Sequence, residues 1–290
     1  MPSARGVPVT LVSVRAQDGV VLNGVAAHPR GRRRTALVWL HGLGSSFASG
    51  QPLVGALARG LNGAGLGYLK LDSRGHGTVA RAGRRLIGAA FERFADSRHD
   101  VRATIALARA CGYRRVILAG HSTGANKALH YLARARDRRV AGLILLGPIS
   151  DVAGERKRIG RRELARRVAA AERLARRDPQ ALVPRSWGFL SARRFLSLYR
   201  PGEAEDVFPY YRPRARWTAL RRVRTPLAVI VGSADEYLDR PARALVAAFE
   251  RNAVGARSFT GIVVPRARHG FRGHEAALAR AVVRWARRLG

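Results

Sequence analysis

The sequence of 290 residues is poor in cysteine, lysine and acidic side chains, and it has no long apolar run. Its one cysteine, Cys111, cannot form a disulfide within the chain, which fits a reducing compartment. The first twenty residues contain no apolar stretch of the length that a secretory signal needs. No run elsewhere approaches the roughly 20 apolar residues that cross a bilayer. We therefore expect a cytoplasmic protein without a membrane span.

Acidic residues are few beside basic ones, 19 against 54, so the formal net charge is +35. Only Lys70, Lys127 and Lys157 are lysines, and the excess is therefore almost all arginine. The arginines are scattered along the chain, without a metal-finger spacing or a Gly-aromatic signature of nucleic-acid binding. The arginine bias of GC-rich genes explains this composition, and we do not expect nucleic acid as a partner. A field of this sign would still attract an anionic small-molecule substrate.

The chain is 47% hydrophobic, which is enough for one large core. Two alternating segments, 8–14 and 20–27, flank an Asp-Gly turn and predict a β-hairpin. From Ala36 on, short apolar runs alternate with segments of helical period, which predicts an α/β fold: a mostly parallel central sheet with helices on both faces. The predicted strands are 36–40, 66–71, 116–119, 140–146, 227–231 and 261–264, and the predicted helices include 101–110, 125–135, 242–249 and 275–289.

One segment, between the fourth and fifth of these strands, has no strand signal. We expect residues 1–150 and 226–290 to form the core, and residues 151–225 to form a helical cap or lid. A charged helix is predicted over 155–177, and an aromatic-rich run follows at 187–211. Because the insertion leaves the sheet at its carboxyl edge, we expect it to set substrate choice. The aromatic run is the candidate wall of a pocket, although any single ring is expected to anchor the lid instead.

The stretch Gly120-His121-Ser122-Thr123-Gly124 follows a predicted strand directly and runs into helix-forming residues. A G-x-S-x-G motif in this setting is typical of a nucleophile elbow, which exposes its serine at the end of a sheet. The serine then lies at a helix N-terminus, where backbone dipoles favour a developing oxyanion. We therefore predict Ser122 as a nucleophile, against the alternative of an ordinary serine in a strand–helix turn.

A glycine-rich loop, His41-Gly42-Leu43-Gly44-Ser45-Ser46, comes directly after the predicted strand 36–40. Acyl transfer needs two backbone N–H donors for the tetrahedral oxygen, one after the nucleophile and one from this earlier loop. We expect these donors from Thr123 and Leu43. His41 is expected to hold the loop by hydrogen bonds, and the alternative is a glycine-rich turn without a role.

The acid and the base of a serine triad are expected downstream of the nucleophile, in that order. Asp235 follows the predicted strand 227–231, and His269 follows the predicted strand 261–264. Both lie past strand ends, at the edge of the sheet that carries Ser122. We therefore predict Asp235 as the acid and His269 as the general base.

Other acids and histidines fit these roles less well. Asp239 lies near Pro241 and is expected to open a helix. Glu236 is expected to point away from the site if Asp235 faces it. His274 is expected to lie at the start of a helix. The remaining histidines considered lie outside strand-end positions: His28, His99 and His130.

The stretch Asp72-Ser73-Arg74-Gly75-His76-Gly77 follows the predicted strand 66–71. An acidic residue after a second strand occurs in dinucleotide sites, but no G-x-G-x-x-G fingerprint precedes it here. We expect Asp72 and Arg74 to hold loops together beside the elbow. No His, Cys, Asp or Glu cluster has metal-ligand spacing, so we predict neither a metal nor a cofactor.

In combination, these motifs resemble the α/β-hydrolase superfamily over nearly the whole chain. The resemblance rests on the loop 41–46, the Asp-x-Arg-Gly-His-Gly stretch 72–77, the elbow 120–124, Gly-x-x-Asp at 232–235 and His-Gly-Phe at 269–271. It implies the α/β-hydrolase fold and a Ser-His-Asp triad, and it says little about substrate.

A narrower resemblance lies in the insertion. Residues 190–198 and 205–208, together with His121-Ser122-Thr123-Gly124, are similar to a family that includes fungal siderophore esterases. Members of that group hydrolyse ester bonds in hydroxamate iron carriers, so the resemblance implies carboxylic-ester hydrolysis. The charged segment 155–177 has no obvious counterpart there.

The sequence thus predicts a serine carboxylic-ester hydrolase that acts on a small-molecule ester through an acyl-enzyme intermediate. An amidase or peptidase, and an acyltransferase, would use the same triad and stay open as alternatives. A binding protein that kept the fold is the non-enzyme alternative, and an intact triad argues against it.

Overall fold

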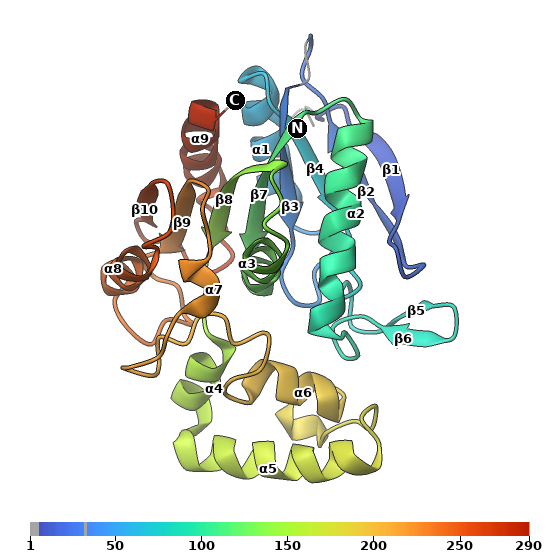
Figure 1. The fold of residues 1–290 in the computed structure, drawn as a ribbon, viewed down its shortest axis with the longest axis vertical. Helices are drawn as coiled ribbons and strands as arrows, with labels where there is room; N and C mark the ends of the chain where they lie inside the picture. Colours follow the sequence, from blue (N-terminus) through green and yellow to red (C-terminus); the bar gives the residue numbers. More distant parts are fainter. Residues whose placement is uncertain (1–5, 32–33, 290) are drawn as a thin grey trace, which may run out of the picture.

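A computed structural model describes residues 6–31 and 34–289 of the chain. Its centre is a sheet of eight strands in the order β1-β2-β4-β3-β7-β8-β9-β10 (Figure 1). β2 runs antiparallel to both of its neighbours, and all pairs from β4 to β10 are parallel. The strands are β1 (Thr10–Arg15), β2 (Val21–Ala27), β3 (Thr35–Leu40), β4 (Gly67–Leu71), β7 (Arg115–His121), β8 (Val140–Leu146), β9 (Leu227–Gly232) and β10 (Phe259–Val264).

Helices cover both faces of this sheet, as the sequence predicts. One hydrophobic cluster joins a sheet face to α2 (Ser97–Ala110), α3 (Thr123–Ala135) and α8 (Ala242–Asn252). A second cluster joins the opposite face to α1 (Gln51–Gly63) and α9 (Glu275–Ala286). Every residue of β3, β4 and β9 is buried, because strands covered on both sides keep no polar face.

The register of the parallel strands brings their carboxyl ends together at one edge. Leu40 of β3 pairs with Gly120 of β7, and His121 pairs with Leu146 of β8. On the other side, Gly232 of β9 pairs with Val264 of β10. The loops that carry the predicted site residues therefore all leave the sheet at the same edge, where ligands bind in open parallel sheets.

Between β8 and β9 the chain forms four α-helices: α4 (Asp151–Ile159), α5 (Arg161–Arg177), α6 (Ala192–Tyr199) and α7 (Thr218–Arg221). Figure 1 shows α4, α5 and α6 below the carboxyl edge of the sheet. The prediction of one continuous helix over 155–177 is wrong. The chain turns at Gly160, whose φ of 83° lies in the left-handed region that glycine adopts readily, and this ends α4.

The insertion divides between two hydrophobic clusters. Residues from α5 and α6 form a small cluster of their own, which includes Ala171, Val183 and Phe195. By contrast, Phe208 and Trp217 pack in the main cluster beneath α3 and α8. The latter part of the insertion is thus built into the sheet domain, while α5 and α6 pack mainly on each other.

The predicted N-terminal hairpin is confirmed by the antiparallel pairing of β1 with β2. A second, small hairpin was not predicted, and it consists of β5 (Ala80–Ala82) and β6 (Arg85–Ile87). Its strands have three residues each, too few to show an alternating pattern. The remaining short elements are 3-10 turns: η1 (Phe94–Asp96), η2 (Arg185–Trp187) and η3 (Arg287–Leu289).

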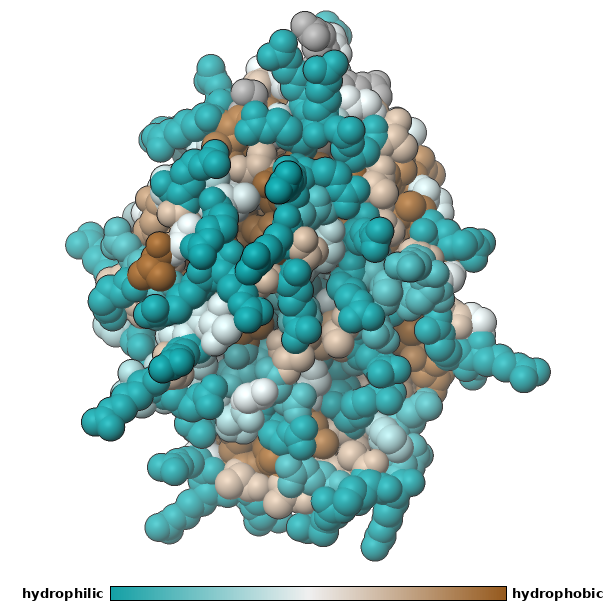
Figure 2. Space-filling view, viewed as in Figure 1, coloured by the Kyte–Doolittle hydropathy of each residue, from teal (hydrophilic) through white to brown (hydrophobic). Residues whose placement is uncertain are grey.

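The surface reflects the composition. Figure 2 shows hydrophilic side chains over most of the visible face, with small hydrophobic areas between them. The larger exposed apolar side chains, such as Leu11 and Val254, lie apart in the sequence. Within the described ranges, no helix combines the length and apolar character needed to cross a bilayer.

Candidate active site

Ser122 lies in a tight turn between β7 and α3. Its φ of 56° and ψ of −129° belong to a region that residues other than glycine rarely adopt. The chain segments around it are in close contact: a Cβ on Gly120 would lie 2.2 Å from the carbonyl oxygen of Gly124. A Cβ on Gly124 would lie 2.3 Å from the carbonyl oxygen of Leu40. Packing therefore requires both glycines of the predicted elbow.

Asp235 and His269 meet at the carboxyl ends of β9 and β10. Nδ1 of His269 lies 2.8 Å from Oδ2 of Asp235, whose side chain is fully buried. An ionised carboxylate only accepts hydrogen bonds, so Nδ1 donates and Nε2 of His269 is left to accept a proton. Gly147, at the end of β8 with a φ of 50°, makes room for the pair, because a Cβ there would lie 3.0 Å from the imidazole Cε1. Ser122 and His269 line the same cavity.

Two residues next to Asp235 also contact His269, and the sequence did not indicate them. Oε2 of Glu236 accepts a hydrogen bond from the backbone N–H of His269 at 3.0 Å. The ring of Tyr237 packs edge-on against the imidazole, with 4.8 Å between the centroids. The expectation that Glu236 points away from the site is therefore wrong. The sequence could not indicate this hydrogen bond, because Glu236 and His269 are 33 residues apart in the chain.

His121, directly before the serine, lies beneath His269. Its Nε2–H donates to the backbone carbonyl of His269 at 2.9 Å, and the two rings are 4.9 Å apart. Burial, with a contribution from His269, lowers the pKa of His121 to about 4. The ring is thus neutral near pH 7, and it can support the backbone of His269 without placing a positive charge beside it.

The predicted oxyanion loop runs against the serine. A Cβ on Gly42 would lie 3.0 Å from Cβ of Ser122, and both Leu43 and Thr123 line the cavity. Thr123 is the first residue of α3, so its backbone N–H has no acceptor within the helix. The backbone N–H of Leu43 likewise has no acceptor among the residues that the structure describes.

His41 holds this loop, as predicted. Its Nδ1 donates to the carbonyl of Gly42 at 2.8 Å, while its Nε2 accepts from the backbone N–H of Ser73 at 2.9 Å. Burial lowers the pKa of His41 to about 3, so the ring stays neutral and keeps this arrangement. Its two bonds join the loop after β3 to the loop after β4.

The cavity beside Ser122 has a volume of about 670 Å³, within the range of small-molecule sites. One wall is the sheet edge, and the opposite wall comes from α4 and α6: Asp151, Gly154, Glu155, Lys157, Arg158 and Tyr199. Tyr199 is the one side chain of the aromatic run 187–211 in this lining, so the expected aromatic wall is wrong for the other rings. Phe195 and Phe208 pack in hydrophobic clusters instead, as the anchoring alternative expects.

The charged groups of this wall differ in their partners. Glu155 accepts two hydrogen bonds from Arg158, at 2.8 and 2.5 Å, and Lys157 donates to the carbonyl of Leu238 at 2.8 Å. The carboxylate of Asp151 makes no hydrogen bond or ion pair with another described side chain. Burial, reinforced by the nearby carboxylate of Glu205, raises the pKa of Asp151 to about 7.

A buried ionic network connects the insertion to the sheet domain. Lys127 of α3 lies 2.6 Å from Glu92, and its Nζ also donates to Ser73 at 3.2 Å. Arg194 of α6 lies 3.6 Å from Glu92 and forms an ion pair with Glu205. All four charged side chains are at most 2% exposed. Ser73 extends the network to His41, and thus to the loop 41–46.

The remaining candidates from the sequence lie elsewhere. Asp239 pairs with Arg240, and α8 begins three residues later without a side-chain cap, so its expected helix-opening role is wrong. His274 stands at the N-terminus of α9, as predicted. Asp72 accepts from the backbone N–H of Phe47 at 2.7 Å, which ties two loops together.

Arg74 ties further loops, as expected, because it pairs with Asp100 at 2.7 Å and with Asp18 at 2.8 Å. Burial opposes the charge on Arg74, but its bonds to both carboxylates outweigh that and raise its pKa. Within residues 6–31 and 34–289, no three His, Cys, Asp or Glu side chains come together to hold a metal ion.

A strained serine, a buried carboxylate–histidine pair and a glycine-rich loop at one sheet edge point to a hydrolase family, and the family model agrees. Residues 37–282 match the model described as the alpha/beta hydrolase family. The chain belongs to this family. The predicted family and fold class are thereby confirmed, and with them the assignment of the chain to hydrolases. No curated protein sequence matches the chain.

Several solved structures share this fold at low identity. The siderophore hydrolase EstB from Aspergillus fumigatus is 19% identical, with a TM-score of 0.74 over 100% of this chain and 99% of that one. Est1E from Butyrivibrio proteoclasticus is 17% identical, with a TM-score of 0.64 over 95% and 97%. A soluble variant of monoglyceride lipase from Saccharomyces cerevisiae is 16% identical, with a TM-score of 0.67 over 98% of both chains. The match to the siderophore hydrolase is consistent with the predicted resemblance to the family that includes fungal siderophore esterases.

Proposed function

We propose that this hydrolase is a serine carboxylesterase, with Ser122 as nucleophile, His269 as general base and Asp235 as the acid that orients the base. The observation that carries the proposal is the 2.8 Å bond from His269 to the buried Asp235, beside a strained serine that lines the same cavity as the imidazole. These are the parts that acyl transfer through a serine requires.

In the proposed acylation step, Nε2 of His269 takes the hydroxyl proton as Oγ of Ser122 attacks the acyl carbon of the ester. The carbonyl oxygen becomes an oxyanion, to which the backbone N–H groups of Leu43 and Thr123 donate. Asp235 stabilises the imidazolium. When the tetrahedral intermediate collapses, the alcohol leaves with the proton from His269, and the acyl group remains on Ser122.

In the second step, a water molecule gives its proton to His269 and attacks the acyl carbon. The same N–H groups hold the second oxyanion, and the imidazolium returns its proton to Oγ of Ser122 as the ester bond to the serine breaks. The carboxylic acid is released. His121, neutral because of its low pKa of about 4, supports the backbone of His269 in both steps.

We also propose that residues 151–225 act as a cap that shapes the substrate site, with 1–150 and 226–290 as the core. Support comes from α4 and α6, which supply the cavity wall opposite the serine. The wall carries Asp151 and Glu155 as well as Lys157 and Arg158, so the excess positive charge of the chain does not extend evenly into the cavity. This composition favours a neutral small-molecule ester over the anionic substrate that the net charge alone would suggest.

The test is hydrolysis of p-nitrophenyl butyrate by the wild-type protein and by the Ser122→Ala and His269→Ala variants. Removal of a triad member should lower kcat by more than about 10³-fold, because it abolishes nucleophilic attack or its activation. Ser13→Ala, a substitution of an exposed serine on β1, is the matched control and should retain full activity. A loss below about 10²-fold in Ser122→Ala would contradict the assignment.

The reaction class needs a second measurement. A panel that contains the ester, the corresponding p-nitroanilide and an added alcohol acceptor should show fast ester hydrolysis and slow anilide hydrolysis. Faster anilide cleavage would identify an amidase, and dominant transfer to the alcohol would identify an acyltransferase. If a fluorophosphonate probe fails to label Ser122 in folded protein, the fold serves binding and not catalysis.

A further inference from the structure

Six arginines converge on a hollow at the amino ends of the strands, at the far end of the sheet from the candidate active site. They come from four separate segments: the start of β7, the α3–β8 loop, the turn before β9 and the turn before β10. The hollow, which we call the arginine cavity, has a volume of about 430 Å³. Its arginines are Arg115, Arg136, Arg138, Arg222, Arg224 and Arg257.

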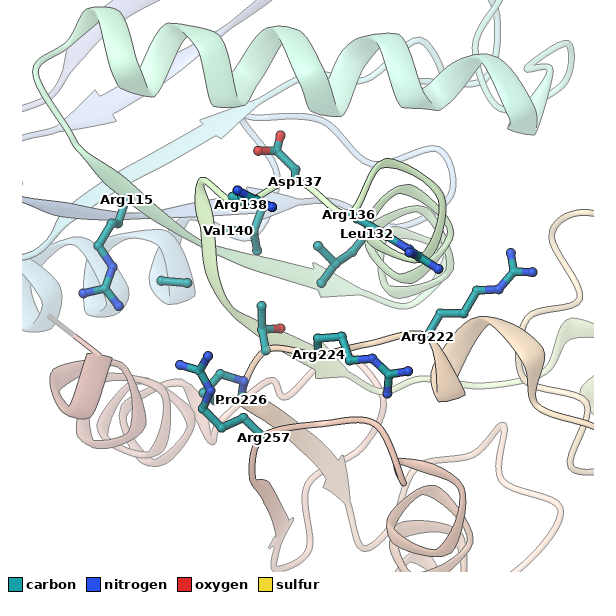
Figure 3. A pocket seen from close by; sticks show the side chains of 12 residues that line it. Arg115, Leu132, Arg136, Asp137, Arg138, Val140, Arg222, Arg224, Pro226 and Arg257 are labelled. Atoms are coloured by element: carbon teal, nitrogen blue, oxygen red, sulfur yellow. The ribbon is translucent and has the colours of Figure 1, made fainter.

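Figure 3 shows how these side chains are arranged. Arg115, Arg138 and Arg136 lie on one side of the cavity, and Arg224 and Arg257 lie on the other. The apolar side chains of Leu132, Val140 and Pro226 also line the cavity. The site is therefore a concave surface with positive charge on two opposing walls and not a flat basic stripe.

The charge in this cavity is not compensated within the described part of the chain. None of the six guanidinium groups forms an ion pair with a carboxylate there. The one carboxylate in the lining, Asp137, is already bonded to Arg139 at 2.6 and 2.8 Å and to the hydroxyl of Tyr131 at 2.6 Å. Gathering like charges without a counter-charge destabilises the folded state, so an anion that binds here would relieve that cost.

Two further features single out this cavity. The hydroxyl of Thr225, a lining residue, is buried and has no hydrogen-bond partner among the described residues, although buried polar groups are normally paired. Arg136 adopts a left-handed φ of 46° at the end of α3, a position where glycine is usual.

We propose that the arginine cavity binds a compact oligophosphate, an anion with two or three linked phosphoryl groups. Guanidinium groups bind phosphate oxygens through paired hydrogen bonds, and opposing walls of arginine suit a ligand with charge on several sides. The site lies apart from the serine, so this inference does not depend on the proposed esterase function.

A second arginine-lined hollow provides the matched control. It lies between α1 and α9 and contains five arginines, of which Arg284 and Arg288 are exposed. Its other lining residues are alanine, valine and glycine, without a hydroxyl. If the arginine-rich composition alone attracted anions, this hollow would bind them as well as the arginine cavity does.

The experiment is a calorimetric titration with sodium tripolyphosphate at constant ionic strength, using the full-length protein. Wild type should bind one equivalent. The double substitution Arg222→Ala and Arg224→Ala should weaken binding by about tenfold or more, the loss expected from one charge-assisted hydrogen bond. The double substitution Arg284→Ala and Arg288→Ala removes the same charge and should leave the Kd within about twofold. Circular dichroism establishes that both variants are folded.

Several outcomes would overturn the proposal. Equal weakening in both double variants, or binding of several equivalents, would indicate non-specific attraction to arginine. Citrate or a single-stranded DNA oligonucleotide bound as tightly, with the same dependence on Arg222 and Arg224, would show that the site does not select oligophosphate. If the variant with Arg222→Ala and Arg224→Ala does not fold, the thermal unfolding of wild type tests the proposal instead. Tripolyphosphate should then raise Tm more than citrate does at equal ionic strength, and an equal or smaller rise would overturn the proposal.

Discussion

Glu236 accepts a hydrogen bond from the backbone N–H of His269 at 3.0 Å, directly after Asp235, which holds the ring of the same histidine. Adjacent carboxylates on one loop thus secure both the main chain and the side chain of the residue that we propose as general base. Arg268, next to that histidine, pairs with the same Glu236 at 3.3 Å. These contacts, with the bond from the backbone N–H of Arg266 to the hydroxyl of Ser233 at 2.7 Å, join the loops after β9 and β10 and limit how far the imidazole can move from the serine.

We expect Glu236→Ala to lower kcat by roughly tenfold or more, with a smaller change in KM, because a misplaced base weakens proton transfer more than substrate binding. Glu236→Gln retains an oxygen that can accept from the N–H, so it should recover most of the activity. Glu250→Ala, which removes an exposed carboxylate on α8, is the control. If Glu236→Gln and Glu236→Ala lower kcat equally, the hydrogen bond to the N–H of His269 does not contribute to catalysis.

The pKa of Asp151 predicts a pH-dependent stability. Burial and the neighbouring carboxylates raise it to about 7 from an ordinary value of 3.8, so the folded state holds this proton more tightly than the unfolded state does. The resulting stabilisation is complete below about pH 4 and is lost as pH rises through 7. Asp151→Asn should therefore gain stability relative to wild type between pH 5 and pH 9, on the order of 1 kcal/mol or more.

This prediction is checked by urea unfolding of both proteins at pH 5 and pH 9. Asp239→Asn serves as the control, because Asp239 is exposed and paired with Arg240. Between pH 5 and pH 9, the free energy of unfolding should fall more in wild type than in Asp151→Asn. An equal change in both proteins would contradict a raised pKa of Asp151.

The ion pair of Arg194 with Glu205 should be critical for stability. Arg194→Ala would leave Glu205 and Glu92 buried without this cation, and breaking a buried pair from one side costs about 3–5 kcal/mol. Arg200→Ala is the matched control, since Arg200 pairs with Glu203 at the surface, where such pairs contribute about 0–1 kcal/mol. Chemical denaturation measures both. Equal effects of the two substitutions would argue against a structural role for the buried network.

Gly154 offers a direct test of the cavity wall. It lines the cavity from within α4, and a Cβ at this position would meet no atom within 4 Å. Gly154→Leu should fill part of the cavity and lower kcat/KM for p-nitrophenyl octanoate by about tenfold or more, while activity on the acetate persists. The variant should remain folded, because leucine is a better helix former than glycine.

The control for this substitution is Gly63→Leu, since Gly63 is also in a helix, with no atom within 4 Å of an added Cβ, and does not line the cavity. It should leave the chain-length profile unchanged. An unchanged profile in Gly154→Leu would mean that α4 does not shape the substrate site.

Local sequence alone was sufficient to predict the sheet core and the elbow. Strands buried on both faces are continuous apolar runs, and a glycine-flanked serine between a strand and a helix has few other structural explanations. The positions of Asp235 and His269 could also be predicted, because the carboxyl ends of parallel strands must lie at one edge whatever the loops do. The register of β7 to β10 confirms that shared edge.

Only the tertiary structure determined which side chains surround this site. Glu236 and Tyr237 contact His269 across a separation of more than thirty residues, and the wall of the cavity comes from polar positions of α4 that look like solvent-exposed residues in the sequence. The burial of Arg194 likewise depends on its contacts with Glu92 and Glu205, which lie in other segments of the chain. The periodicity of apolar residues predicts which face of a helix or strand is buried. Which charged groups form ion pairs, and which side chains line a cavity, depends on residues that are distant in the chain.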